Sequence, residues 1–217
     1  MRTRPARFAG LFERHAELRP IAAQLDAAFG LLVRTYEGRG TVYVGGNGGS
    51  AADSEHIVGE LMKGMERRRP LTDSMRSALT AAAPVGFDED ATYLADRLER
   101  ALPTVSLTSQ TALISAVAND TAGDMSFAQQ VHGYGRPGDT FWALSTSGRS
   151  RNVVLAAIAA RAVGVGVLAL TGDPGEPLGP LADVWVRVPT ADVAGAQELH
   201  LAVYHAMCVA LEEEFFG

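Results

Sequence analysis

The sequence predicts a three-layer α/β/α sandwich, in which a central parallel sheet is covered by helices on both faces. Short β-branched or apolar runs alternate with segments of helical spacing, and the order strand, polar loop, helix occurs twice, at residues 41–66 and 140–163. Strands that are joined through helices run parallel, so this alternation favours a parallel sheet of the flavodoxin or Rossmann type. The length of 217 residues suits a single domain over residues 1–217.

Two helices are expected before the first strand, within residues 1–38. Residues 6–18 and 20–37 both carry apolar side chains about 3.6 residues apart, which is typical of an amphipathic helix. Pro20 suits the first turn of the second helix, because proline lacks the N–H that would be unpaired there. Gly38 then ends that helix.

The sheet and its covering helices account for most of the remaining chain. The apolar runs at 165–171 and 183–188 are nearly continuous, a pattern typical of strands buried on both faces. Strands are expected at residues 41–44, 104–107, 140–144, 165–171 and 183–188, and helices at 51–66, 150–163 and 194–215.

Residues 71–101 interrupt this alternation and predict a helical insertion. Two short helices are expected there, separated by a break at residues 84–86. Leu94, Leu98 and Leu102 form an apolar stripe on the second helix. This stripe could pack against its own subunit or against a neighbouring one, and the sequence does not choose between the two.

The composition indicates an ordinary water-soluble globular protein. Apolar residues make up 47% and charged residues 20% of the chain, which is too apolar for a disordered chain. The net charge of −6 disfavours binding to nucleic acid or to anionic membranes, and no segment is apolar enough for a membrane helix. Cys208 is the single cysteine, so an internal disulfide is excluded and a reducing, cytoplasmic location is expected.

A glycine-rich loop, residues 45–50, connects a strand to a helix and predicts an anion-binding site. Backbone N–H groups and the positive end of the helix converge there, and Asn47 and Ser50 add polar side chains. A tight turn that needs positive φ would have the same composition, so the loop alone does not establish a ligand site. Its spacing is not G-x-G-x-x-G, which disfavours a dinucleotide.

A second, hydroxyl-rich loop (residues 145–150) follows the strand expected at 140–144. Its hydroxyl groups suit a phosphate monoester, although they could equally cap the following helix. Ligands of open parallel sheets bind beyond the carboxyl ends of the strands, where both loops are expected, so the two loops together predict a phosphorylated small molecule. The hydroxyl groups belong to Ser145, Thr146, Ser147 and Ser150.

Polar side chains on two of the expected helices could supply acid, base or metal-binding groups. His56 and Glu60 are four residues apart and therefore reach the same surface, but a solvated ion pair is an equally good explanation. Gln197, His200 and His205 lie on the last helix, where a histidine can simply belong to the core. Gln197 and His205 are separated by about 12 Å of helix rise, so they would share one ion only with extended side chains or between subunits.

The candidate residues form a combination that can be compared with known families. They are Gly46-Asn47-Gly48-Gly49-Ser50, His56 with Glu60, Asn119-Asp120, Ser145-Thr146-Ser147 with Ser150, and Ala196-Gln197-Glu198-Leu199-His200 with His205. This combination resembles the sugar isomerase (SIS) family, and within it most closely the phosphoheptose isomerases. The resemblance covers residues 6–215, and the insertion at 71–101 is similar to that of a longer subgroup.

The resemblance implies an aldose-ketose isomerase that acts on sedoheptulose 7-phosphate. The product would be D-glycero-D-manno-heptose 7-phosphate or its C2 epimer, formed through an enediol as the first step toward activated heptoses. The resemblance also implies a divalent metal, usually zinc, and a homotetramer with its active sites at subunit interfaces.

The resemblance further assigns roles to individual residues. Glu60 and His205 would be the acid/base pair. The metal ligands would be His56, Glu60, Gln197 and His205. The substrate would be contacted by Asn47, Gly48, Gly49, Ser50, Glu60, Asn119, Asp120 and Gln197, and its phosphate would be held by Ser145, Thr146, Ser147 and Ser150.

The chemistry of the reaction agrees with the roles of the acid/base pair. Moving a carbonyl between C2 and C1 requires a base that takes a proton from one carbon and returns it to the other, and Glu60 can do this. A second group must move a proton between the two oxygens, and the imidazole of His205 is the candidate. A metal with nitrogen and oxygen ligands would either polarise the carbonyl or only hold its ligands in place.

Two other functions remain open on the sequence alone. One is a non-catalytic SIS module that binds a protein partner, similar to the replication-initiator-associating proteins. Such modules lack the full acid/base pair, whereas Glu60 and His205 are both present here. The other is an isomerase of a different sugar phosphate, which commonly carries additional C-terminal regulatory domains that the sequence up to Gly217 does not show.

Overall fold

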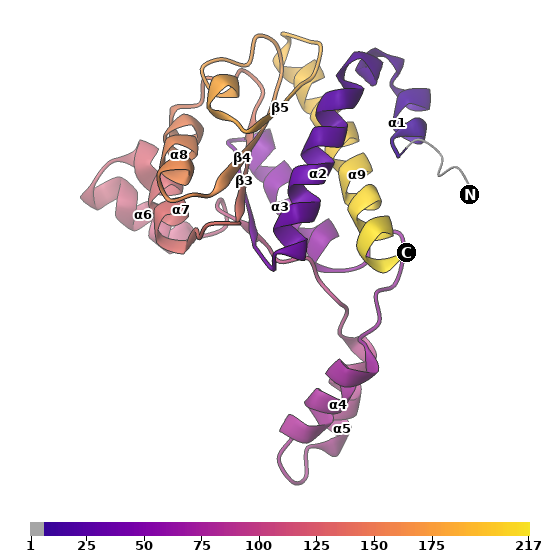
Figure 1. Ribbon diagram of the computed structural model, residues 1–217. Coiled ribbons are helices and arrows are strands. Elements are labelled where there is room, and N and C mark those ends of the chain that lie inside the picture. Colours follow the sequence, from indigo (N-terminus) through magenta and orange to yellow (C-terminus); the bar gives the residue numbers. More distant parts are fainter. Residues whose placement is uncertain (1–6) are drawn as a thin grey trace.

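The computed structural model describes residues 7–217, in which a five-stranded sheet lies between two layers of helices (Figure 1). All neighbouring strands are parallel, in the order β2-β1-β3-β4-β5. This arrangement confirms the expected three-layer α/β/α sandwich. The strands are β1 (Val42–Gly45), β2 (Thr104–Ser106), β3 (Thr140–Ser145), β4 (Gly166–Thr171) and β5 (Val184–Arg187).

The helices alternate with these strands along the chain. They are α1 (Ala9–Arg14), α2 (Ala22–Glu37), α3 (Gly49–Met62), α4 (Asp73–Ala82), α5 (Asp88–Arg97), α6 (Thr111–Asp120), α7 (Ser126–Tyr134), α8 (Arg151–Ala162) and α9 (Val193–Phe216), with 3-10 turns η1 (Ala16–Ile21), η2 (Gly123–Met125) and η3 (Gly179–Leu181). No helix among residues 7–217 has the length and apolar character needed to cross a lipid bilayer.

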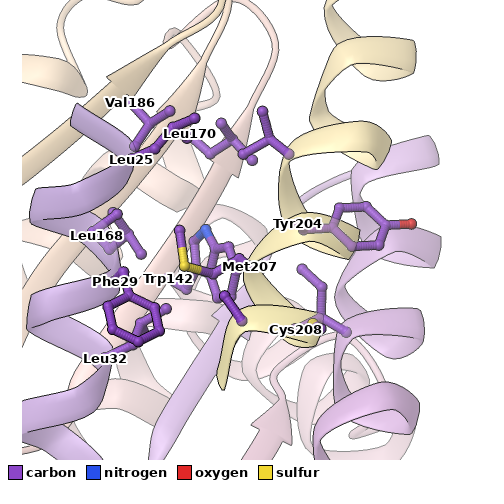
Figure 2. Packing of buried hydrophobic residues seen from close by; sticks show 14 of the residues in the cluster. Leu25, Phe29, Leu32, Trp142, Leu168, Leu170, Val186, Tyr204, Met207 and Cys208 are labelled. Atoms are coloured by element: carbon purple, nitrogen blue, oxygen red, sulfur yellow. The ribbon is translucent and has the colours of Figure 1, made fainter. Parts of the chain in front are cut away.

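Alternate side chains of each strand point to opposite faces of the sheet and form two apolar cores. Trp142 belongs to the core beneath α2, α3 and α9, whereas its neighbour Phe141 belongs to the core beneath α7 and α8. Figure 2 shows residues of the first core, among them Leu25 and Phe29 of α2, Trp142 of β3 and Met207 of α9. Each fully buried side chain of this size contributes roughly 1.5–3 kcal/mol, so α3 and α9 are held firmly on one face.

The N-terminal helices differ from the expected ones. The helix expected over 6–18, whose first residue lies outside the described part, ends at Arg14 and is followed by the 3-10 turn η1. The helix expected over 20–37 begins at Ala22, because Pro20 lies inside η1 rather than in the first α-helical turn. Proline disfavours the α conformation in the residue before it, which explains why the regular helix starts only after it.

Two further elements differ from the prediction. The helix expected over 51–66 is α3, which ends earlier because Lys63 has an extended backbone. The strand expected over 183–188 is β5, and the expectation that it is buried on both faces is wrong. It lies at the edge of the sheet, where it pairs with β4 on one side, and Arg187 is exposed. The helices α6 and α7, which lead from β2 to β3, are additional elements that the sequence analysis did not assign.

The expected insertion forms a helical hairpin that projects from the body, here called the arm (residues 71–101; Figure 1). Its helices α4 and α5 pack mainly against each other, and Arg76 joins them through an ion pair with Asp96 at 2.6 Å. Of the expected leucine stripe, Leu102 is buried against the body, but Leu94 and Leu98 are exposed. Most of the stripe is therefore left exposed by the rest of residues 7–217.

Candidate active site

The two loops expected to bind a ligand lie side by side at the carboxyl edge of the sheet. β1 and β3 are paired, and the strand order reverses between them, which is where ligands of open parallel sheets bind. Asn47 of the glycine-rich loop is joined to Asn152 of α8, the helix that follows the hydroxyl-rich loop, because each amide donates a hydrogen bond of 2.8 Å to the oxygen of the other. The glycine-rich loop therefore lies against the start of the helix that follows the hydroxyl-rich loop.

The glycine-rich loop brings the start of α3 against α9. Gly48 has a φ of 55°, a conformation that favours glycine, and it precedes the first residue of the helix. A Cβ atom on Gly49 would lie 1.5 Å from Nε2 of Gln197, so the Gln197 side chain rests directly against this turn. Ser50 is buried, and its N–H donates to the carbonyl oxygen of Asn47 at 3.0 Å. The loop thus places Asn47 at the surface with Gln197 beside it.

Not all hydroxyl groups of the hydroxyl-rich loop form capping hydrogen bonds with α8. Ser150 occupies the N-cap of α8, but its side chain makes no capping hydrogen bond and instead lies 3.0 Å from the hydroxyl of Ser145. Ser147 Oγ accepts a hydrogen bond of 3.2 Å from the N–H of Arg149. The alternative that these hydroxyls only cap the helix therefore does not hold at Ser150. Hydroxyl groups and the helix N-terminus together can receive a phosphate group.

A cluster of ionisable side chains lies between α3 and α9. Nε2 of His56 is 3.1 Å from Oε1 of Glu60, and the ring of His205 lies 4.9 Å from that of His56, edge to face. The Glu60 side chain is only 16% exposed, whereas that of His56 is 42% exposed. The structure thus brings together Glu60, His205 and His56, which are three of the four expected metal ligands and include both members of the expected acid/base pair.

Burial changes the acidity of several groups in this cluster. The pKa of His205 is lowered by burial and by the nearby His56, which keeps its imidazole neutral at neutral pH. Burial raises the pKa of Asp53 and, together with the charge of Asp53, also raises that of Tyr204. Burial lowers the pKa of His200 to about 4, in keeping with a histidine of the core. A neutral imidazole at position 205 can both accept and donate a proton.

Other predicted site residues do not join this cluster within one chain. Gln197 lies against Gly49, two helical turns before His205, so the two are not brought together. Asn119 and Asp120 end α6, and Nδ2 of Asn119 donates to Oδ1 of Asp120 at 2.8 Å. Because α6 packs mainly on α7 and η2, this pair lies apart from the α3–α9 cluster (Figure 1). The roles given to all these residues stay predictions.

The donor chemistry of the cluster fits a divalent metal ion. Nε2 of His205 is buried and makes no hydrogen bond to the described residues, which leaves a free nitrogen ligand beside His56 and Glu60. Imidazole and carboxylate groups are ordinary zinc ligands. Within residues 7–217, however, no three His, Cys, Asp or Glu side chains are gathered in an arrangement that could hold a metal as they stand.

Three residues of the site were missed by the sequence analysis. Asn152 is the second residue of α8, and an asparagine there gives no periodic signal. Asp53 precedes His56 by one turn and could have been found as a third polar residue on the same face of α3. Tyr204 forms hydrogen bonds with His56 and Asp53, but in the sequence it cannot be distinguished from an ordinary core aromatic residue.

The comparisons with known proteins give the class of protein first. Residues 90–172 match the family described as SIS domain. This range contains α6, α7, β3 and the hydroxyl-rich loop. The part of the chain that holds the hydroxyl-rich loop is therefore of the SIS domain class.

Comparisons over the whole chain are more specific. A phosphoheptose isomerase of Akkermansia muciniphila is 32% identical over 96% of this chain and 94% of its own length. A phosphoheptose isomerase of Rhodospirillum rubrum is 35% identical over 94% of this chain and 92% of its own length. The solved structure of a phosphoheptose isomerase from Neisseria gonorrhoeae has a TM-score of 0.73 and 29% identity, and the match covers 96% of both chains. The chain belongs to the phosphoheptose isomerase family, which confirms the resemblance.

Proposed function

We propose that this chain interconverts sedoheptulose 7-phosphate and an aldoheptose 7-phosphate through an enediol. The observation that carries the proposal is the cluster of Glu60, His56 and His205 between α3 and α9. The glycine-rich loop, which begins α3, lies at the same carboxyl edge of the sheet. Membership of the phosphoheptose isomerase family supports the same substrate class.

The phosphate group is bound at the hydroxyl-rich loop in this proposal. Hydroxyl groups and unpaired N–H groups at a helix start stabilise a phosphate dianion without requiring a basic side chain. The sugar then extends along the paired asparagines toward α3. The phosphate ligands are Ser145, Thr146, Ser147 and Ser150, and the sugar contacts are Asn47, Gly48, Gly49, Ser50, Glu60, Asn119, Asp120 and Gln197.

Two proton transfers complete the reaction. The carboxylate of Glu60 takes the proton from one of the two reacting carbons and returns it to the other. The imidazole of His205 moves a proton between the two neighbouring oxygens, for which its lowered pKa is suitable, because the neutral ring can accept as well as donate. A positioned acid or base of this kind contributes a factor of about 10²–10⁴ to the rate.

A divalent metal, with zinc as the first choice, is part of the proposal. His56, Glu60, Gln197 and His205 would hold it, and the orphaned nitrogen of His205 is the structural support for such a role. When bound, the ion would supply a positive charge that stabilises the developing oxygen anion. The side chains of this chain alone supply the base and the proton shuttle.

We also propose a homotetramer with active sites at subunit interfaces, located in the cytoplasm. The exposed leucines of the arm favour contact with another subunit. A second chain would also relieve the separation of Gln197 from His205 and bring other copies of Asn119 and Asp120 to the site. A single, buried cysteine suits a reducing compartment.

The decisive experiment is incubation with sedoheptulose 7-phosphate in D₂O, followed by NMR. We expect an aldoheptose 7-phosphate that carries deuterium at C2, because the proton that Glu60 holds while the enediol exists exchanges with solvent. Activity should fall on treatment with a chelator and return with Zn²⁺. Absence of any conversion, with and without added metal, would refute the proposed function.

A further inference from the structure

A buried tyrosine connects the candidate cluster to a second carboxylate. Tyr204 is fully buried on α9, and Figure 2 shows its hydroxyl pointing away from the apolar core. This hydroxyl lies 3.0 Å from Nδ1 of His56 and donates to Oδ1 of Asp53 at 3.2 Å. Nε2 of the same histidine lies 3.1 Å from Glu60. The four groups form one hydrogen-bonded row across α3 and α9.

Counting protons along this row fixes the role of Nδ1 of His56. A carboxylate such as Asp53 can only accept, so the single proton of the Tyr204 hydroxyl is donated to it. The tyrosine oxygen can then only accept from the histidine, which requires the proton of His56 to be on Nδ1. The other ring nitrogen, Nε2, faces the carboxylate of Glu60 at 3.1 Å and is the only ring nitrogen left to bind a cation.

At 3.1 Å, Nε2 of His56 and the carboxylate of Glu60 can share either a proton or a bound cation. We propose that Tyr204, anchored by Asp53, is a positioning residue that holds His56 in its Nδ1-protonated tautomer. It thereby presents the Nε2 lone pair and the Glu60 carboxylate together to a divalent cation. The proposal rests on the proposed metal site, but the tautomer itself needs neither metal nor substrate.

The position of the row supports this role. The His56 side chain is 42% exposed, so packing alone does not fix the orientation of its ring. Tyr204 and Asp53 are both buried, and they belong to different helices that share one core. A hydrogen bond from the buried side therefore determines which nitrogen faces Glu60, as partners of metal-binding histidines commonly do.

The tautomer can be observed directly in the full-length, metal-free protein with ¹⁵N-labelled histidine. The ring nitrogen shifts of His56 should show a proton on Nδ1. A bare Nδ1 beside a protonated Nε2 would overturn the proposal, because His56 would then accept a hydrogen bond from Tyr204 instead of donating one. This measurement can fail even if the isomerase activity is present, so the two outcomes are distinguishable.

A pair of Tyr→Phe variants provides the matched test. Tyr204→Phe keeps the ring but removes the hydroxyl, and we expect the His56 signals to shift toward the other tautomer. The affinity for Zn²⁺, measured by competition with a chromophoric chelator, should fall by about 10–100-fold. Tyr36→Phe removes a buried hydroxyl that forms a hydrogen bond with Thr104 away from the site. It should change neither the His56 signals nor the affinity for Zn²⁺. Equal Zn²⁺ affinity in Tyr204→Phe and the unmodified protein would refute the positioning role.

Discussion

Gly49 is the residue that allows Gln197 to lie against the start of α3. A methyl group at this position would overlap the end of the Gln197 side chain, which is flexible and would swing away. We therefore expect Gly49→Ala to lower kcat/KM by about 10–100-fold with little change in Tm, because a displaced contact group misaligns the substrate. Steady-state kinetics and thermal unfolding measure the two effects.

Gly59 offers the matched control on the same helix. An added Cβ meets nothing within 4 Å there, so Gly59→Ala should keep its activity and gain up to about 1 kcal/mol of stability from helix propensity. If Gly49→Ala were as active as Gly59→Ala, Gln197 would have no part in the site.

The carboxylate of Glu60 is the residue on which the chemistry depends. Glu60→Gln keeps the volume but removes the base, so kcat should fall by about 10²–10⁴-fold while the Kd for sedoheptulose 7-phosphate stays within a few-fold. Calorimetric titration and kinetics separate the two quantities. Glu55→Gln is the control, because Glu55 is an exposed carboxylate on the same helix that accepts from Thr108 and Ser109. A Glu60→Gln variant with normal kcat would exclude the carboxylate as base.

Single residues could be predicted from the sequence where spacing alone defines the geometry. His56 and Glu60 are four apart on one helix, so their contact follows from helix geometry without knowledge of the fold. The approach of Tyr204 to His56 depends on how α9 lies beside α3. That packing is a tertiary property, and no local pattern in either helix encodes it.

At the scale of elements, a buried ion pair holds the segment that follows α3 against α9. Glu212 of α9 pairs with Arg69 at 2.8 Å and also accepts from the N–H groups of Met65 and Glu66, each at 2.9 Å. The guanidinium of Arg69 in turn donates to the carbonyl oxygens of Glu60 and Leu61, at 3.0 and 2.8 Å. The ion pair therefore fixes the helical turn that carries the proposed base.

Removing one member of this pair should destabilise the fold strongly. We expect Glu212→Gln to cost about 3–5 kcal/mol, because it leaves the buried charge of Arg69 without its partner. Glu213→Gln is the control, since Glu213 forms an exposed pair with Arg67 whose loss should cost at most about 1 kcal/mol. Chemical denaturation of both variants at neutral pH makes the comparison.

The effect of Glu212 should depend on pH in a definite direction. Burial raises the pKa of its carboxyl, but hydrogen bonds from Met65 and Glu66 and the charge of Arg69 outweigh burial and hold the pKa below the ordinary value of 4.5. A lowered pKa means that the ionised group stabilises the folded state at neutral pH, and that this stability is lost as the pH falls through the folded-state pKa. The difference between the unmodified protein and Glu212→Gln should shrink below about pH 4.5. A difference that is constant down to acid pH would contradict this assignment.

Elements with a clear apolar pattern were predictable, and those without one were not. The strands and the helices α3, α8 and α9 follow the expected alternation within a few residues. The helix α6 buries only Val117, and in α7 the polar Gln130 occupies a core position, where it donates to the carbonyl of Leu107. Neither helix therefore shows a clean stripe. The edge position of β5 depends on strand order, which the apolar content of a strand does not specify.

At the scale of the whole molecule, exposed apolar side chains are concentrated on the arm. Half of the large apolar side chains that are exposed among residues 7–217 lie in this hairpin. The sequence already indicated that the insertion has an apolar stripe, but the stripe alone did not show whether the body of the same subunit would cover it. In the structure the arm projects from the body, and the rest of residues 7–217 leaves Leu94 and Leu98 exposed (Figure 1).

Charges placed on the arm should therefore reduce the number of subunits in the assembly. We expect the double variant Leu94→Glu, Leu98→Glu to remain folded, because both side chains are exposed in the single chain, and to have a lower mass than the proposed tetramer. Light scattering coupled to size-exclusion chromatography gives the mass, and circular dichroism checks the fold. Ile158→Glu, an exposed apolar residue on α8, is the control and should keep the original mass. If the double variant assembled like the unmodified protein, the arm would have no part in the subunit contacts, and the separated site residues would have to be brought together by another surface.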